Sequence, residues 1–254
     1  MLKFLTKSVA PIAIVAALAA CGEANDGAAT APTAGGDASG SAAAAQTGAS
    51  AEKSWVRTMT KTAEGGYRIG NPDAPVKLVE FGSLSCSHCA TFHEEAMQEL
   101  KGEYIASGDV SYELRTFVLN PPDLLATLLA RCSTPEAFFA LSDAFFENQQ
   151  SWFEPFTQLT EAQQNELQSM DPKAGRVRFA EMGELDEFVR ARGIPASKFR
   201  SCIDDESGLE ELDGIRQSAI EDYELTGTPT FVLNGERIDA NRWDQVKTAI
   251  DGAL

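Results

Sequence analysis

The sequence predicts an α/β fold in which a small sheet is interrupted by a helical insertion, and three observations lead to this prediction. A strand, helix, strand pattern runs through residues 76–119. Nearly all of residues 121–224 are helical in character. The strand pattern then returns at Thr230 and is followed by a closing amphipathic helix. The two halves of the sheet are therefore expected to lie far apart in the sequence.

The first half of the predicted sheet contains a buried strand, a helix and a second strand. Val76–Phe81 is a compact apolar run between a proline and a glycine, which is typical of a central strand buried on both faces. A helix is expected to begin near Cys86 and to end near Leu100, and the second strand is expected at Val110–Leu119. This connection is long enough for a parallel crossover. Before these elements, Trp55–Ile69 is expected to form short edge strands or a hairpin.

The insertion begins where Asn120 and two prolines end the second strand. Thr134 followed by Pro135 is a favourable N-cap and first-turn pair for a helix. Further helices are expected around Glu161–Met170, Leu185–Arg192, Pro195–Cys202 and Leu209–Leu225. After the insertion we expect a hairpin with its turn at Asn234–Gly235, and then a helix at Trp243–Ile250.

The overall charge argues against one class of partner. The chain has 21 Lys and Arg residues against 38 Asp and Glu residues, a formal net charge of −17. Because a nucleic-acid backbone requires a basic surface that displaces its counterions, no binding to nucleic acid is expected.

The N-terminal residues have the pattern of an export signal. Lys3 and Lys7 form a positively charged segment, and Val9–Ala20 is apolar but short for a membrane span. The apolar segment ends in Leu-Ala-Ala before Cys21, which resembles the lipobox of bacterial lipoproteins. This resemblance implies that residues 1–20 are a lipoprotein signal peptide. It also implies that lipidated Cys21 anchors the mature chain at the periplasmic face of a bacterial membrane, inner or outer. Ordinary signal cleavage with a spare cysteine is the alternative.

A tether is expected between this anchor and the folded part of the chain. Residues 21–54 are rich in Ala, Gly and Ser and have few side chains to bury, so disorder is expected. A flexible coil of this length reaches roughly 30 Å. The folded domain is then expected at residues 55–254.

Cys86 and Cys89 stand three positions apart at the predicted start of a helix, which favours redox chemistry. Backbone N–H groups and the helix dipole at this position stabilise the thiolate of Cys86, which is then the nucleophile. Cys89, one turn behind and more enclosed, can resolve a mixed disulfide by attacking Cys86. His88 between them can add a positive charge or a hydrogen bond to the thiolate.

Two other interpretations of this cysteine pair stay open. Cys86, Cys89 and His93 have a spacing that could supply three ligands to zinc. The chain has only two histidines and no second pair of cysteines at this spacing to complete a structural site, so no metal is expected. A purely structural disulfide is the other alternative.

Three features taken together resemble one known family. They are the run from Pro75 to Phe92, the segment TGTPTF at residues 226–231, and the helical stretch between them. In these features the sequence resembles the DsbA-like branch of the thioredoxin superfamily over most of residues 66–253. The resemblance implies a thioredoxin-like fold with a helical insertion domain near residues 121–224, and no cofactor.

The resemblance also implies roles for site residues. Cys86 is the attacking cysteine and Cys89 the resolving one. Pro229 is a cis-proline that faces the disulfide, and the backbone of Thr228 is free to pair with an extended substrate. Glu80 matches a buried acidic residue beneath the active site, which could tune thiol ionisation or relay a proton. A Glu80 carboxylate turned to solvent is the alternative.

The remaining two cysteines, Cys132 and Cys202, are predicted to form a second, structural disulfide, as in some relatives of this family. Closing a loop of about 70 residues could stabilise the fold by about 4 kcal/mol. Two free buried thiols, or a regulatory couple that shifts the potential of the first pair, are the alternatives.

The expected activity is thiol-disulfide exchange outside the cytoplasm. The resemblance implies that the Cys86–Cys89 disulfide oxidises reduced or unfolded exported proteins, and that a membrane quinone-linked thiol oxidase regenerates it. Many oxidants of this family have proline where this chain has Ser87, so a disulfide isomerase or a client-specific reductase is an alternative. A thioredoxin-fold metallochaperone or a non-catalytic binding lipoprotein is a further alternative.

Overall fold

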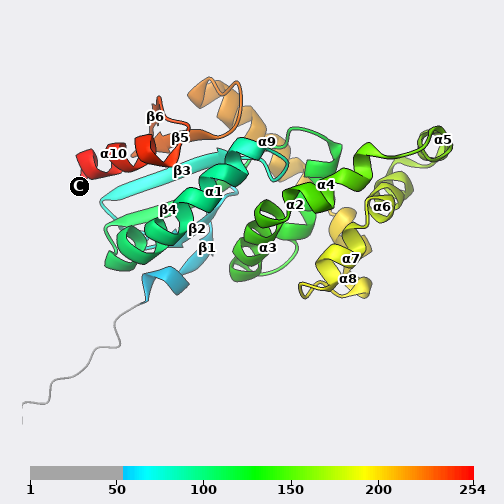
Figure 1. The fold of residues 1–254 in the computed structure, drawn as a ribbon, viewed down its shortest axis with the longest axis horizontal. Coiled ribbons are helices and arrows are strands. Elements are labelled where there is room, and N and C mark those ends of the chain that lie inside the picture. The colour runs from blue at the N-terminus through cyan, green and yellow to red at the C-terminus, as the bar shows by residue number, and fades with distance from the viewer. Residues whose placement is uncertain (1–53) are drawn as a thin grey trace, which may run out of the picture. The chain divides into compact units, whose positions relative to one another are not determined.

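The computed structural model describes residues 54–254, and Figure 1 shows their fold. The predictions for residues 1–20, for Cys21 and for nearly all of the 21–54 tether lie outside the described residues. Within the described part, no helix has both the length and the apolar character needed to cross a bilayer.

The described strands form one six-stranded sheet with the order β1-β2-β4-β3-β5-β6. β3 and β4 run parallel, from Val76 opposite Val110 to Gly82 opposite Thr116, and the other neighbouring strands are antiparallel. This arrangement confirms the predicted parallel crossover and both hairpins. The strands are β1 (Met59–Lys61), β2 (Tyr67–Gly70), β3 (Val76–Gly82), β4 (Val110–Thr116), β5 (Thr230–Leu233) and β6 (Glu236–Ile238).

The strand predicted to reach Leu119 ends earlier, at Thr116. Its parallel neighbour β3 ends opposite this point, and the Phe117 N–H donates one more hydrogen bond to the Gly82 carbonyl at 2.7 Å. The chain then turns to Asn120, whose side chain accepts a hydrogen bond from the Asp123 N–H and caps the next helix. Helix capping therefore competes with strand extension here.

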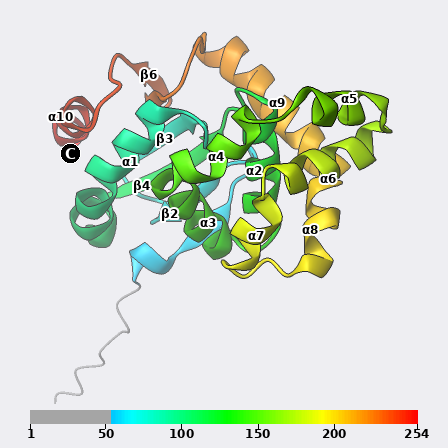
Figure 2. The same ribbon diagram turned by 45° about the vertical axis from the view of Figure 1, so that its right-hand side comes forward.

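Helices flank the sheet and build the insertion, and the helices predicted around residues 161–225 are all present. In both Figure 1 and Figure 2, helices α5 to α8 lie at the end of the domain remote from α10. The helices are η1 (Trp55–Arg57), α1 (Ser87–Glu99), η2 (Leu100–Ile105), α2 (Pro121–Arg131), α3 (Pro135–Glu147), α4 (Gln149–Thr157), α5 (Glu161–Ser169), α6 (Pro172–Met182), α7 (Leu185–Arg190), α8 (Ala196–Ile203), α9 (Glu206–Tyr223) and α10 (Trp243–Ala253).

The first helix is longer than predicted because it continues past Leu100 as the π-helix η2. Leu100 and Ile105 are both fully buried and are five positions apart, which is the spacing of a π turn. The wider turn therefore brings both side chains into the core. Gly108, with a φ of +89°, ends the connection before β4.

The two faces of the sheet have different helical covers, and β3 shows which face each side chain meets. Leu78 belongs to the larger core cluster together with Phe92 of α1. Phe81 belongs to the smaller cluster together with Ile215 of α9. Because side chains alternate along a strand, Glu80 points to the same face as Leu78, beneath α1.

A disulfide between Cys132 and Cys202 joins the end of α2 to α8, with a Cα–Cα distance of 5.4 Å. It connects two helices whose cysteines are 70 positions apart in the sequence. The insertion is thereby closed covalently at one point.

Candidate functional site

Cys86 stands at the N-cap of α1, directly after the loop that leaves β3. It is partly buried, and its Sγ lies 3.3 Å from the Thr228 carbonyl oxygen. The pKa of Cys86 is lowered from 9.0 to about 5, most strongly by a hydrogen bond from Cys89. Thr228 and the backbone N–H groups of Cys89 and His88 lower it further, against partial burial. Cys86 is therefore a thiolate at neutral pH.

Cys89 has the opposite ionisation. Its side chain is fully buried, and this burial raises its pKa well above the ordinary value for a thiol. The hydrogen bond with Cys86 and the negative charge of Glu80 raise the pKa of Cys89 further. In the dithiol form that the structure contains, the two pKa shifts favour a thiolate at Cys86 and a protonated thiol at Cys89.

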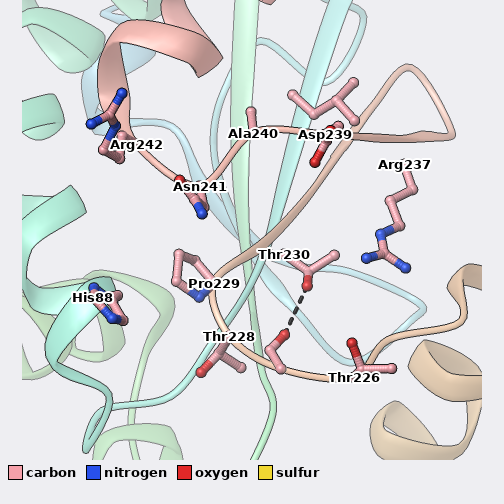
Figure 3. A pocket seen from close by; sticks show the side chains of 12 residues that line it. His88, Thr226, Thr228, Pro229, Thr230, Arg237, Asp239, Ala240, Asn241 and Arg242 are labelled. Carbon is pink, nitrogen blue, oxygen red and sulfur yellow. Dashed lines mark hydrogen bonds between the residues drawn. The ribbon is translucent and has the colours of Figure 1, made fainter.

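The loop before β5 lies beside this pair. The Thr228–Pro229 peptide bond is cis, and the Thr230 hydroxyl donates to the Gly227 carbonyl at 2.7 Å. A cavity of about 460 Å³ opens here, between the first turn of α1 and residues 226–230 and 237–242. Figure 3 shows His88 beside the loop that carries Thr228 and Pro229. The structure thus brings Cys86, His88, Thr228 and Pro229 together as predicted site residues.

Sequence reasoning missed a buried carboxylate that holds the loop before Cys86. Asp123 of α2 is fully buried and accepts hydrogen bonds from the Ser83 hydroxyl at 2.6 Å and the Leu84 N–H at 3.0 Å. It also accepts one from the Leu119 N–H at 2.9 Å. Burial raises the pKa of Asp123 to about 6, although these hydrogen bonds lower it. An acidic residue three positions after a helix-capping asparagine was the available signal, but it pointed only to capping.

Glu80 is fully buried beneath α1, so its side chain is not turned to solvent. The Tyr112 hydroxyl donates to Glu80 Oε2 at 2.7 Å, and His93 Nε2 lies 3.3 Å from the same oxygen. Burial and the negative charge of Glu80 raise the pKa of Tyr112, so this hydroxyl keeps its proton and remains a donor. A Cβ at Gly82 would lie 2.7 Å from Glu80 Oε1, so glycine leaves room for the carboxylate. Tyr112 and Gly82 carried no signal in the sequence.

The zinc interpretation of Cys86, Cys89 and His93 has no support in the geometry. His93 is buried, stacks on the Phe146 ring at 4.0 Å between centroids, and faces Glu80 and Tyr112. Among residues 54–254, no group of three His, Cys, Asp or Glu side chains is arranged to hold a metal ion. His93 is therefore part of the polar cluster around Glu80.

Comparisons with known proteins agree with this geometry. A family model described as Thioredoxin matches residues 62–252. A curated relative from Rickettsia felis, named "Putative protein-disulfide oxidoreductase", is 26% identical over 200 residues, which are 78% of this chain. This chain covers 64% of that relative's length.

Solved structures are also similar. The crystal structure of a protein-disulfide isomerase from Novosphingobium aromaticivorans has a TM-score of 0.70 and 31% identity, and the match covers 75% of this chain and 98% of that one. The fold of Wolbachia pipientis alpha-DsbA1 is similar, with a TM-score of 0.59 and 22% identity over 74% of this chain and 90% of that one. With its thioredoxin-like sheet, helical insertion and paired cysteines, the chain belongs to the thioredoxin family.

Proposed function

We propose that this protein is an extracytoplasmic thiol-disulfide oxidoreductase that introduces disulfides into exported proteins through Cys86 and Cys89. The observation that carries the proposal is the opposite ionisation of the two thiols. The pKa of Cys86 is about 5, whereas the pKa of Cys89 is raised well above that of an ordinary thiol. A stabilised Cys86 thiolate favours the dithiol form of the enzyme, and this makes its disulfide a stronger oxidant.

The reaction is an exchange of two electrons between two pairs of sulfur atoms. A substrate thiolate attacks Sγ of Cys86, the Cys86–Cys89 bond breaks, and Cys89 leaves with the electron pair and takes up a proton. A second substrate thiolate then attacks the substrate sulfur of the mixed disulfide, and Cys86 leaves as a thiolate. The substrate gains a disulfide and the enzyme becomes a dithiol. A membrane quinone-linked thiol oxidase then accepts the two electrons and restores the enzyme disulfide.

The other site residues position the substrate and the sulfurs. An extended substrate segment pairs with the backbone beside Thr228 and Pro229, next to Cys86. His88 lies at the edge of the same cavity, where it contacts the substrate. Cys132 and Cys202 stabilise the insertion and take no part in the exchange.

A lipid on Cys21 would hold this activity at the periplasmic face of a bacterial membrane, with residues 21–54 as a tether. Comparing cells that express the unchanged chain with cells that express the Cys21→Ser variant tests this proposal. We expect fatty-acid label and membrane association in the first, and neither in the second. Equal membrane association of both chains would refute the anchor.

Two measurements test the direction of electron flow. Equilibration with glutathione gives the reduction potential, and an oxidase is expected near the protein disulfide isomerase and DsbA values of about −180 to −120 mV. A potential near the thioredoxin value of about −270 mV would support a reductase instead. Refolding of reduced ribonuclease measures oxidase activity, and Cys86→Ser is expected to abolish it. Retained activity in Cys86→Ser would refute the proposed role of this couple.

An isomerase is the second candidate, because the similar Novosphingobium aromaticivorans structure is titled a protein-disulfide isomerase. Scrambled ribonuclease is already fully oxidised but has incorrectly paired disulfides, so it separates the two activities. An oxidase regenerates reduced ribonuclease much faster than it repairs the scrambled form. The opposite ratio would favour the isomerase.

A further inference from the structure

A row of polar side chains runs from Glu80, which lies beneath α1, to Asp143 of α3. Glu80 Oε2 accepts a hydrogen bond from Tyr112 at 2.7 Å and lies 3.3 Å from His93 Nε2. The Tyr112 oxygen is itself 3.1 Å from His93 Nε2. On the other side of the imidazole ring, His93 Nδ1 lies 3.9 Å from Asp143 Oδ1. The histidine therefore stands between a fully buried carboxylate and a partly exposed one.

Two buried atoms on this path have no hydrogen-bond partner, namely Glu80 Oε1 and His93 Nδ1. Buried polar atoms are nearly always paired in folded proteins, so an unpaired one calls for an explanation. Proton transfer provides one, because an atom that is not committed to a permanent hydrogen bond can accept or release a proton when a donor or acceptor comes within reach. The Glu80 charge raises the pKa of Cys89, which places the carboxylate within electrostatic reach of that thiol. Of the two free atoms, His93 Nδ1 lies toward the next group on the path, Asp143.

The path ends in a groove along α1. Its cavity has a volume of about 690 Å³, and both His93 and Asp143 line it, together with one helical stripe of α1 and residues from α3 and α4. Asp143 also pairs with Lys101 at 2.8 Å. A single water molecule from the groove can bridge a gap such as that between His93 and Asp143. The groove shares no lining residue with the cavity at the cis-proline loop.

We propose that His93 and Asp143 carry the proton of Cys89 between Glu80 and this groove. The inference rests on the proposed roles of Cys86 and Cys89. A substrate docked beside Thr228 covers the cis-proline side of Cys86, so a separate route keeps Cys89 connected to solvent throughout the exchange. His93 and Asp143 act through Glu80 and are therefore positioning residues.

The proton moves as the sulfur bonds change. When Cys89 resolves a mixed disulfide, its proton passes to the Glu80 carboxylate and its thiolate attacks Sγ of Cys86. The Cys86–Cys89 bond forms, the bond from Cys86 to the substrate sulfur breaks, and the substrate leaves as a thiolate with the electron pair. His93 accepts a proton from Glu80 at Nε2 and releases one from Nδ1 toward Asp143 and solvent. When a substrate thiolate opens the disulfide, the same route returns a proton to Cys89.

Reaction of the reduced full chain with dithiobis(nitrobenzoate) separates the reaction of Cys86 from that of Cys89 in time. All variants are made in a Cys21→Ser background, which removes the thiol at position 21. Attack by Cys86 releases the first thionitrobenzoate, and attack by Cys89 on the resulting mixed disulfide releases the second. Stopped-flow absorbance records both phases. We expect His93→Gln and Asp143→Asn to slow the second phase by roughly tenfold, and to leave the first phase nearly unchanged. The solvent deuterium isotope effect on the second phase should rise in both variants, because proton transfer then limits the rate.

Glu147→Gln is the matched control, because it removes an exposed carboxylate that lines the same groove. Both of its phases should match those of the background chain. Three results would overturn the relay: an unchanged second phase in both test variants, equal slowing of both phases, or the same slowing in Glu147→Gln. A first release that persists in Cys86→Ser would instead refute the proposed function. Urea unfolding midpoints verify that each variant is folded.

Discussion

One hydrogen bond accounts for much of the acidity of Cys86, and Cys89→Ala removes it. The Cys89 thiol is the largest contribution that lowers the pKa of Cys86 to about 5. A hydrogen bond to a charged group contributes about 1.5–3 kcal/mol, and one pKa unit corresponds to about 1.4 kcal/mol. Full loss would therefore raise the pKa by about one to two units. We expect the lower end, because Cys86 is partly exposed and water replaces part of the lost bond.

The ultraviolet absorbance of the thiolate, recorded against pH, measures this change. A Cys21→Ser background and the Cys132–Cys202 disulfide leave only the active-site thiols to titrate. The raised pKa of Cys89 keeps it protonated across the acidic and neutral range. Thr228 and the backbone N–H groups still stabilise Cys86 in the variant, so its pKa should stay below 9.0.

Cys89→Ser is the control, because a serine hydroxyl at the same position can still donate a hydrogen bond to the thiolate. Its titration midpoint should lie close to that of the intact pair. Equal midpoints in Cys89→Ala and Cys89→Ser would refute the hydrogen-bond explanation. A midpoint near 9.0 in the intact pair would refute the assignment of Cys86 as the thiolate.

Three further predictions concern stability. Burial raises the pKa of Asp123 from 3.8 to about 6, so protonation favours the folded state. This contribution to stability is complete below pH 3.8 and is lost as pH rises through about 6. The urea midpoint of the oxidised protein should therefore rise relative to that of Asp123→Asn as pH falls. A difference between the two midpoints that stays constant with pH would contradict this. Gly82→Ala should destabilise the fold by about 1–3 kcal/mol through overpacking, measured by urea denaturation. Gly102→Ala should be neutral or stabilising in the same assay, because no atom lies within 4 Å of the new Cβ. Equal effects of the two substitutions would contradict the packing explanation. Replacing Cys132 and Cys202 with alanine should lower the free energy of unfolding by up to about 4 kcal/mol. The reduction potential of the active-site pair, measured against glutathione, should stay unchanged. A shifted potential would identify a regulatory couple.

The acidity of Cys86 could be predicted because several of its causes are local. Cys86 and Cys89 are one helical turn apart, and the backbone N–H groups that stabilise the thiolate belong to the same turn. Helix capping at Thr134 depends equally on nearest neighbours. The π-helix after Leu100 was missed because tertiary burial of Ile105 decides it, and local propensity does not.

The surroundings of Glu80 show where sequence reasoning stops. Tyr112 reaches Glu80 because β3 and β4 pair in a parallel register in which Tyr112 lies opposite Leu78. His93 was considered only as a metal ligand, because its spacing from the cysteines was the one relation that the sequence made visible. Asp143 comes from the insertion, 50 positions further along the chain.

By itself, the sequence determined the α/β class, the position of the insertion and the helix that begins at Cys86, our proposed nucleophile, since hydrophobic periodicity and helix-end chemistry act over a few residues. Only the tertiary structure decided that Asp123 holds the loop before Cys86, and that His93 links Glu80 to Asp143. These contacts depend on strand register and on how the insertion helices pack against α1, and no local pattern in the chain encodes either.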